Sequence, residues 1–248
     1  MEILIFFLLV VNLAALLLIW RKVKKIHLFC WMLQEEMGKQ STNVIRNIES
    51  LDSLYRELKF PRSLPPTMGF AASPDFLRLI ADYAASEDVD HILECSSGIS
   101  TIVLAQVMKL KGRGHVYSLE NDAQYADISR ENLKKYNLED WTTVITAPLT
   151  EVSLQGQVYN WYDIDEKLPD IEFDGLVVDG PPWSVSENAR YPAGPQLFGK
   201  LKTGAHIFLD DFVREGEQKA VEMWLQDNPN ITLFRHPLMK GCAELVKN

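Results

Sequence analysis

The first twenty residues contain one long apolar stretch. Every position from Ile3 to Trp20 is apolar except Asn12. At about 1.5 Å per helical residue this stretch reaches roughly 27 Å, close to a hydrocarbon thickness of about 30 Å. Cations follow the stretch at once, at 21, 22, 24 and 25, which reverses the order of a cleaved signal peptide. We therefore expect residues 1–20 to be a single-pass transmembrane anchor, with the N-terminus outside and the remaining chain cytoplasmic.

The next stretch is amphipathic and predicts a helix from Ile26 to about Leu58. Its apolar side chains recur at alternating spacings of four and three residues: Val44, Ile48, Leu51, Tyr55 and Leu58. This seam of about two heptads is short for a coiled coil, so packing on the chain's own domain is favoured over a homodimer through the stalk. Prolines at 61, 65 and 66 end the helix, and residues 21–66 are expected to form a juxtamembrane helical stalk and linker.

Beyond residue 66, short apolar runs alternate with helical patterns. Five runs predict buried strands: His91–Cys95, Val116–Leu119, Thr143–Thr146, Gly175–Val178 and His206–Leu209. Helices are expected over Pro74–Ala85, Ile99–Leu110, Asp122–Tyr136 and Glu215–Asp227, and a terminal hairpin over Ile231–Arg235 and Ala243–Val246. This order predicts an α/β domain over residues 67–248. Its sheet should be doubly wound (Rossmann-like) and mostly parallel, with a C-terminal antiparallel hairpin.

Composition and charge narrow the function classes. The 248 residues are 47% apolar and 24% charged, as in a folded globular protein. A net charge of −9 makes general nucleic-acid binding an unfavourable reading, because the chain lacks the cations that displace phosphate counterions. Three scattered cysteines without CxxC spacing predict neither a disulfide framework nor a cysteine zinc site.

The first strand, loop and helix of the domain carry the main functional signal. They read His91-Ile-Leu-Glu-Cys-Ser-Ser-Gly-Ile-Ser-Thr101. Small loop residues let a ligand approach the backbone, and the helix start offers free N–H donors. Glu120 ends the next strand, where a carboxylate can bind the two hydroxyls of a ribose. Glu94, just before the loop, would repel a pyrophosphate and suits a nucleoside that carries an ammonium and a sulfonium.

The same unit resembles the first motif of the class I S-adenosylmethionine-dependent methyltransferases, here Glu94-Cys-Ser96-Ser-Gly98-Ile-Ser100-Thr101. Segments 147–149, 161–163, 178–182, 190–193 and 209–211 are similar to a bacterial O-methyltransferase-like branch. Ser96 stands where the first glycine of the motif usually lies, so we expect a strained backbone there. The resemblance implies S-adenosylmethionine as the cofactor, bound by Glu94, Ser96, Gly98, Thr101, Glu120, Asn121, Ala147 and Pro148.

Three carboxylates are expected at the reaction end of the crevice. Asp179 follows the fourth strand, and Asp210 and Asp211 follow the fifth. Asp179 could act as a catalytic general base, or all three could hold Mg²⁺ through oxygen ligands. Similarity to catechol-type O-methyltransferases favours the metal, although Pro182 stands where those enzymes carry a lysine. The alternative is that Asp210 or Asp211 only caps a loop or helix.

The loop from Trp183 to Gly194 should cover the acceptor. Trp183, Arg190 and Tyr191 offer an apolar face, a cation and a hydroxyl, which suit a sugar or an anionic substrate. Packing of Trp183 and Tyr191 in the core is an equally good reading.

The leading hypothesis is a membrane-anchored methyltransferase that O-methylates a small-molecule, glycan or lipid-linked acceptor at the cytoplasmic membrane face. Two alternatives stay open on the same sequence. One is a nicotinamide-dependent oxidoreductase, and the other is a non-catalytic membrane-tethered scaffold with a methyltransferase fold.

Overall fold

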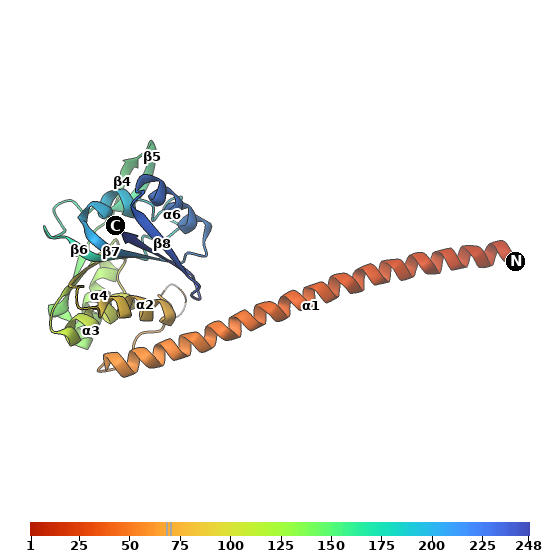
Figure 1. The fold of residues 1–248 in the computed structure, drawn as a ribbon, viewed down its shortest axis with the longest axis horizontal. Helices are drawn as coiled ribbons and strands as arrows, with labels where there is room; N and C mark the ends of the chain where they lie inside the picture. Colours follow the sequence, from red (N-terminus) through yellow and green to blue (C-terminus); the bar gives the residue numbers. More distant parts are fainter. Residues whose placement is uncertain (68, 70) are drawn as a thin grey trace. The chain divides into compact units, whose positions relative to one another are not determined.

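The structure is a computed structural model that describes residues 1–67, 69 and 71–248. Its contacts divide these residues into two compact units, 1–46 and 47–248. Figure 1 shows α1 as one continuous helix, Glu2–Leu58, so the expected anchor and stalk helix form without a break. An 18-residue window of α1 has a mean hydropathy of 3.0, and the helix is long and apolar enough to cross a membrane.

The last turns of α1 pack on the second unit. Leu54 and Leu58 are buried in a hydrophobic cluster with Phe76 and Leu77. The Gln106 side chain also donates a hydrogen bond of 2.7 Å to the Leu58 carbonyl oxygen. Packing of the stalk on its own domain is thus confirmed for these turns, whereas Val44 and Ile48 are exposed.

A seven-stranded mixed sheet forms the centre of the second unit, in the order β3-β2-β1-β6-β7-β9-β8. Its five parallel strands are β3 (Thr142–Thr146), β2 (His115–Glu120), β1 (His91–Cys95), β6 (Phe173–Val178) and β7 (Leu201–Asp210). The antiparallel strands β9 (Cys242–Lys247) and β8 (Ile231–His236) complete one edge. The predicted fold class is confirmed for this domain.

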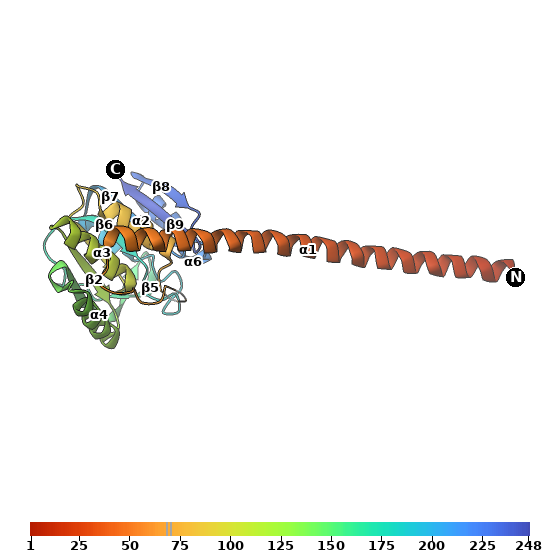
Figure 2. The ribbon, with the colours of Figure 1, turned by 90° about the horizontal axis from the view of Figure 1, so that it is seen from below.

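Helices cover both faces of the sheet, as Figures 1 and 2 show. The helices are α2 (Pro74–Ala84), α3 (Ile99–Lys111), α4 (Ala123–Tyr136), α5 (Ala193–Leu197) and α6 (Glu215–Asp227), with short 3-10 turns at Glu139–Trp141 and Phe198–Lys200. On one face α2 and α3 pack against Ile92 and Val177. On the other face α6 packs against Leu176 and Ile207. Burial of the central strands β1 and β6 on both faces explains their apolar runs in the sequence.

Neither the short helix α5 nor the hairpin that follows β3 was predicted from the sequence. Strands β4 (Leu149–Leu154) and β5 (Gln157–Tyr162) form a separate antiparallel hairpin after β3. Trp161 and Tyr162 of this hairpin are fully buried in the same core as α6. The hairpin therefore covers the sheet face that α5 and α6 also cover.

Candidate functional site

The loop between β1 and α3 begins in a strained conformation. Ser96 has a φ of 91°, in the region that favours glycine, which confirms the expected strain. Gly98 has an extended φ of 170° that any residue can adopt. Gly180, after β6, lies against the loop: a Cβ on Gly180 would be 2.8 Å from the Cβ of Ser96 and 2.4 Å from the Tyr162 hydroxyl oxygen. The loop is thus held between two neighbouring strand ends.

Glu94 lies beneath this loop and is connected to it by hydrogen bonds. The Gly98 N–H donates to Oγ1 of Thr101 (2.9 Å), and that hydroxyl donates to Oε2 of Glu94 (2.6 Å). Within the described part of the chain, Oε1 of Glu94 is buried without a partner. Burial raises the pKa of Glu94 to about 7, against the lowering effect of nearby hydroxyls. A cationic ligand in the loop fits this free carboxylate oxygen.

Glu120 ends β2 beside the same loop. Its Oε2 accepts hydrogen bonds from the Ser97 N–H (3.1 Å) and the Ser97 hydroxyl (2.8 Å), and its Oε1 accepts one from the Asp122 N–H (3.1 Å). A carboxylate has about four acceptor positions, so it can bind ribose hydroxyls in addition. Sequence reasoning missed Ser97, whose only signal was its place in a small-residue loop.

The remaining predicted cofactor residues lie at the neighbouring strand ends. Asn121 follows Glu120 and is half-buried. Ala147 follows β3, is buried, and donates its N–H to the Glu120 carbonyl oxygen at 2.8 Å. Pro148 is exposed beside it. The eight predicted residues therefore lie at the carboxyl ends of β1, β2 and β3 or in the segments that follow them.

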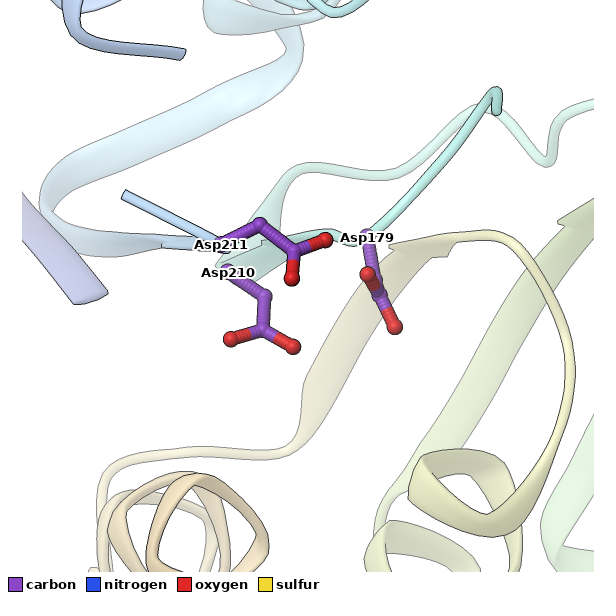
Figure 3. A group of neighbouring side chains, drawn as sticks. All are labelled: Asp179, Asp210 and Asp211. Carbon is purple, nitrogen blue, oxygen red and sulfur yellow. The ribbon is translucent and has the colours of Figure 1, made fainter. Parts of the chain in front are cut away.

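Asp179, Asp210 and Asp211 converge at the adjoining ends of β6 and β7 (Figure 3). Each offers a carboxylate oxygen within 4.8 Å of the other two. Both oxygens of Asp210 are buried and have no partner among the described residues. We call these three residues the acidic cluster. Their convergence follows from the parallel arrangement of the two strands.

Arg190 already supplies a cation to the acidic cluster. Its Nη2 lies 3.1 Å from Oδ1 of Asp179 and 3.0 Å from Oδ2 of Asp211. The same nitrogen donates to the Asp179 carbonyl oxygen (2.8 Å), and Nη1 donates to the Asp210 carbonyl oxygen (2.9 Å). The side chain is only 4% exposed. This position differs from the expected contact with an acceptor, because the guanidinium is directed into the protein and its charge is offset there.

Burial and the mutual repulsion of the carboxylates give Asp179 and Asp210 different pKa values. Burial raises the pKa of Asp179 to about 6, while the charge of Arg190 opposes the rise. Burial and the charges of Asp179 and Asp211 raise the pKa of Asp210 to about 8. Asp179 therefore loses its proton at a lower pH than Asp210 does, which suits Asp179 to accept a proton.

The carboxylate oxygens of the acidic cluster lie close enough together to hold a metal ion, and a guanidinium competes for them. Mg²⁺ needs oxygen ligands at about 2.0–2.1 Å in near-octahedral geometry. Arg190 already bonds Asp179 and Asp211, two of the three ligands that the ion would use. Arg214 also contacts Oδ2 of Asp211, at 2.8 Å. The predicted gathering of three carboxylates is present, and the cation that they hold is a guanidinium.

The loop after β6 borders an open cavity of about 380 Å³ next to the acidic cluster. Trp183, which is 63% exposed, lines this cavity together with Arg190 and Arg214. Tyr191 lies instead in the core, where its hydroxyl donates to Oδ2 of Asp227 (3.0 Å) and its carbonyl oxygen accepts from Nε1 of Trp224 (2.7 Å). The packing alternative therefore holds for Tyr191, and Trp183 is left as the exposed aromatic side chain of the predicted acceptor set.

Comparison with known proteins finds a matching family and several solved structures with a similar fold. A family model described as a methyltransferase domain matches residues 93–212. This match includes the β1 loop, the end of β2, and the acidic cluster. No curated protein sequence matches the chain.

Solved structures share the fold at low sequence identity. A methyltransferase from Podospora anserina, bound to S-adenosylhomocysteine, has a TM-score of 0.57 at 16% identity, over 82% of this chain and 88% of its own. The O-methyltransferase TomG from Streptomyces achromogenes, in complex with S-adenosylmethionine, has a TM-score of 0.57 at 15% identity, over 84% and 96%. An O-methyltransferase from Bacillus cereus, also with S-adenosylhomocysteine, has a TM-score of 0.50 at 22% identity, over 81% and 91%.

Proposed function

Because the chain is an S-adenosylmethionine-dependent methyltransferase, we propose that it transfers the methyl group to an oxygen atom of its acceptor. The observation that carries the proposal is the position of Asp179: its N–H donates to the Cys95 carbonyl oxygen at the end of β1, and its carboxylate accepts a hydrogen bond from Arg190, which lines the open cavity. Two of the proteins with similar folds are themselves O-methyltransferases. The family sets aside the nicotinamide-dependent oxidoreductase and the non-catalytic scaffold.

The cofactor is proposed to lie along the carboxyl ends of β1, β2 and β3. The free oxygen of Glu94 would accept a hydrogen bond from the ammonium of the methionine part. Ser96, Gly98 and Thr101 would shape the loop against it. Glu120 would hold the ribose hydroxyls, with Asn121, Ala147 and Pro148 on the nucleoside side.

Asp179 is proposed as the general base of the reaction. S-adenosylmethionine, when bound, supplies the methyl group: the acceptor oxygen bonds the methyl carbon while the carbon–sulfur bond breaks and leaves its electron pair on sulfur. Asp179 takes the proton that the acceptor hydroxyl loses. The products are a methyl ether, S-adenosylhomocysteine and a protonated Asp179, which then releases its proton to solvent. Trp183 would pack on the apolar face of the acceptor.

Residues 1–20 are proposed to cross the membrane once. The support is the hydropathy of the window in α1 and the four cations that follow Trp20. The N-terminus would then lie outside, with the stalk (21–66) and the catalytic domain (67–248) on the cytoplasmic side. Tethering raises the local concentration of membrane-associated molecules, so we propose a small-molecule, glycan or lipid-linked acceptor at this face.

The exposed part of the stalk is proposed to join a second copy of the chain. Between the anchor and the domain, α1 exposes apolar or thiol side chains at alternating spacings of three and four residues: Val23, Ile26, Cys30, Leu33 and Met37. After Gln40 the same spacing reaches Val44, which is also exposed. This repeat spans about three heptads, the length at which a coiled coil becomes the favoured reading. A membrane anchor would hold two such helices parallel.

The test of the proposed reaction follows the methyl label. Membranes containing the full-length chain are incubated with S-adenosylmethionine labelled in the methyl group, and the labelled products are extracted. Ethers keep the label under mild base, esters release it as methanol, and both carry it on oxygen. We expect label on oxygen with the native chain and about 10²–10⁴-fold slower labelling with Asp179→Asn. Label on nitrogen or carbon would contradict the proposal.

A further inference from the structure

We infer that the guanidinium of Arg190 is the resident cation of the acidic cluster, in the place where a divalent metal ion would bind, so that this chain transfers methyl groups without a metal. The second part of the inference rests on the proposed O-methyl transfer. The first part concerns only what the acidic cluster binds.

Arg190 occupies the position that a bridging metal ion would need. Nη2 of Arg190 lies between the carboxylates of Asp179 and Asp211, at 3.1 and 3.0 Å. A bridging ion would have to bond the same two residues. Nη1 and Nη2 also donate to the carbonyl oxygens of Asp210 and Asp179, so the guanidinium bonds both strand ends through main chain and side chain. Planar guanidinium groups match such a set of oxygens better than a point charge does.

The charges around Arg190 are already balanced. Four carboxyl groups lie at this place, those of the acidic cluster and of Glu217, whose Oε1 is 3.7 Å from Nε of Arg190. Three cations already face them: Arg190, Arg214, and Lys240 at 3.9 Å from Asp211. A buried cation without partners would be very costly, and Arg190 has its partners here. An added divalent ion would leave the place with an excess of positive charge beside Arg190.

Arg190 is fixed in place by its neighbour in the chain, Tyr191. Tyr191 is fully buried, with its hydroxyl on Asp227 and its carbonyl oxygen on Trp224. Its N–H donates to the Asn188 carbonyl oxygen. Moving the guanidinium out of the acidic cluster by a backbone shift would therefore pull an aromatic ring from the core. The loop holds Arg190 in place, and Arg190 in turn positions Asp179 through Oδ1 and the carbonyl oxygen.

The inference is tested by direct metal binding, without cofactor or acceptor. Mn²⁺ accepts the same oxygen ligands as Mg²⁺ and is counted by electron paramagnetic resonance on the full-length chain in detergent. We expect no specific Mn²⁺ site in the native chain. Arg190→Met removes the guanidinium and keeps an unbranched side chain, so it should create a site that binds at least tenfold more tightly. Asp210→Asn in the Arg190→Met background should remove that site.

Matched controls make the result specific. Arg113→Met removes an exposed arginine that pairs with Glu87 outside the acidic cluster, and it should leave Mn²⁺ binding unchanged. Circular dichroism shows whether Arg190→Met folds, and Arg190→Lys, which keeps a charge, should fold and bind no Mn²⁺. If Arg190→Met does not fold, the native chain and Arg190→Lys still decide the question.

Two outcomes would overturn the inference. A specific Mn²⁺ site in the native chain that is lost in Asp210→Asn would show that a metal ion binds beside Arg190. A folded Arg190→Met chain without a new site would show that Arg190 does not stand in a metal position. Methyl transfer that persists in excess chelator supports the second part. Failure of the proposed O-methyl transfer alone would leave the Mn²⁺ result standing.

Discussion

Ser96 and Gly180 are in contact across the ends of β1 and β6. Ser96 holds a φ of 91°, and a Cβ on Gly180 would lie 2.8 Å from its Cβ. Ser96 stands where the family motif usually has its first glycine, and the facing residue, Gly180, has no side chain. The loop conformation therefore depends on the two positions together.

We predict that Gly180→Ala destabilises the fold by about 1–3 kcal/mol, because the added methyl meets both the Cβ of Ser96 and the hydroxyl of the buried Tyr162. Ser96→Gly removes one of these contacts and the strained φ. In the Ser96→Gly background, Gly180→Ala should therefore lower the free energy of unfolding by less than it does in the native chain, with a difference of about 0.5–1 kcal/mol. Chemical denaturation of the four chains measures this coupling. Strict additivity would show that the two residues do not constrain each other.

Cofactor affinity should depend on pH through Glu94. Burial raises the pKa of Glu94 to about 7, and a cationic ligand favours the ionised carboxylate. Below pH 7 binding must first remove a proton, so the affinity for S-adenosylmethionine should rise with pH, approaching tenfold per unit well below pH 7, and level off above it. Calorimetric titrations between pH 5.5 and 8.5 measure this. Glu94→Gln, which cannot ionise, should bind weakly with a flat profile, and a sloping profile in this variant would contradict the assignment.

Asp179 should control turnover and leave cofactor binding intact. Asp179→Asn removes the proton acceptor, so kcat should fall by about 10²–10⁴-fold. Since burial raises the pKa of Asp179 to about 6, the carboxylate is protonated at lower pH, and the rate of the native chain should rise through about pH 6 to a plateau. Stopped assays of S-adenosylhomocysteine formation give both results. A variant that keeps its full rate would exclude Asp179 as the base.

Cys30 offers a probe of the proposed stalk dimer. It is exposed, whereas Cys95 and Cys242 are buried, and in a parallel pair of helices it would face its own copy. We predict that a short bismaleimide cross-links the full-length chain in membranes through Cys30. The matched control places the thiol on another face of the helix, as Leu28→Cys in a Cys30→Ser background. Equal cross-linking from both positions would indicate random collision.

Much of the fold could be predicted because its signals are local. The central strands β1 and β6 contain short apolar runs, and α2 begins at Pro74 as expected, because proline is common at the first position of a helix. The β4–β5 hairpin gave a weaker signal. Its first strand is largely polar and exposed, and its turn, Gln155-Gly156, carries positive φ at both residues without the usual asparagine. Hydropathy alone does not separate such a hairpin from a loop.

The site residues also differ in how well the sequence predicts their positions. Glu94, Glu120 and Asp179 could be found because acids at strand ends meet at one edge of a parallel sheet. The position of Arg190 could not be found, because its direction is set by tertiary contacts. Tyr191 is held by Asp227 and Trp224 of α6, far along the chain. From the sequence, a tyrosine beside an arginine in a loop looks equally suited to binding an acceptor.

The central claim is that the ends of β1, β2 and β3 hold S-adenosylmethionine. Isothermal titration of the full-length chain in detergent with S-adenosylmethionine and S-adenosylhomocysteine tests it most directly, with Glu120→Ala as the comparison. We predict micromolar binding of both compounds to the native chain and loss of binding in Glu120→Ala, because the ribose loses its carboxylate partner. A folded native chain that binds neither compound would contradict the account.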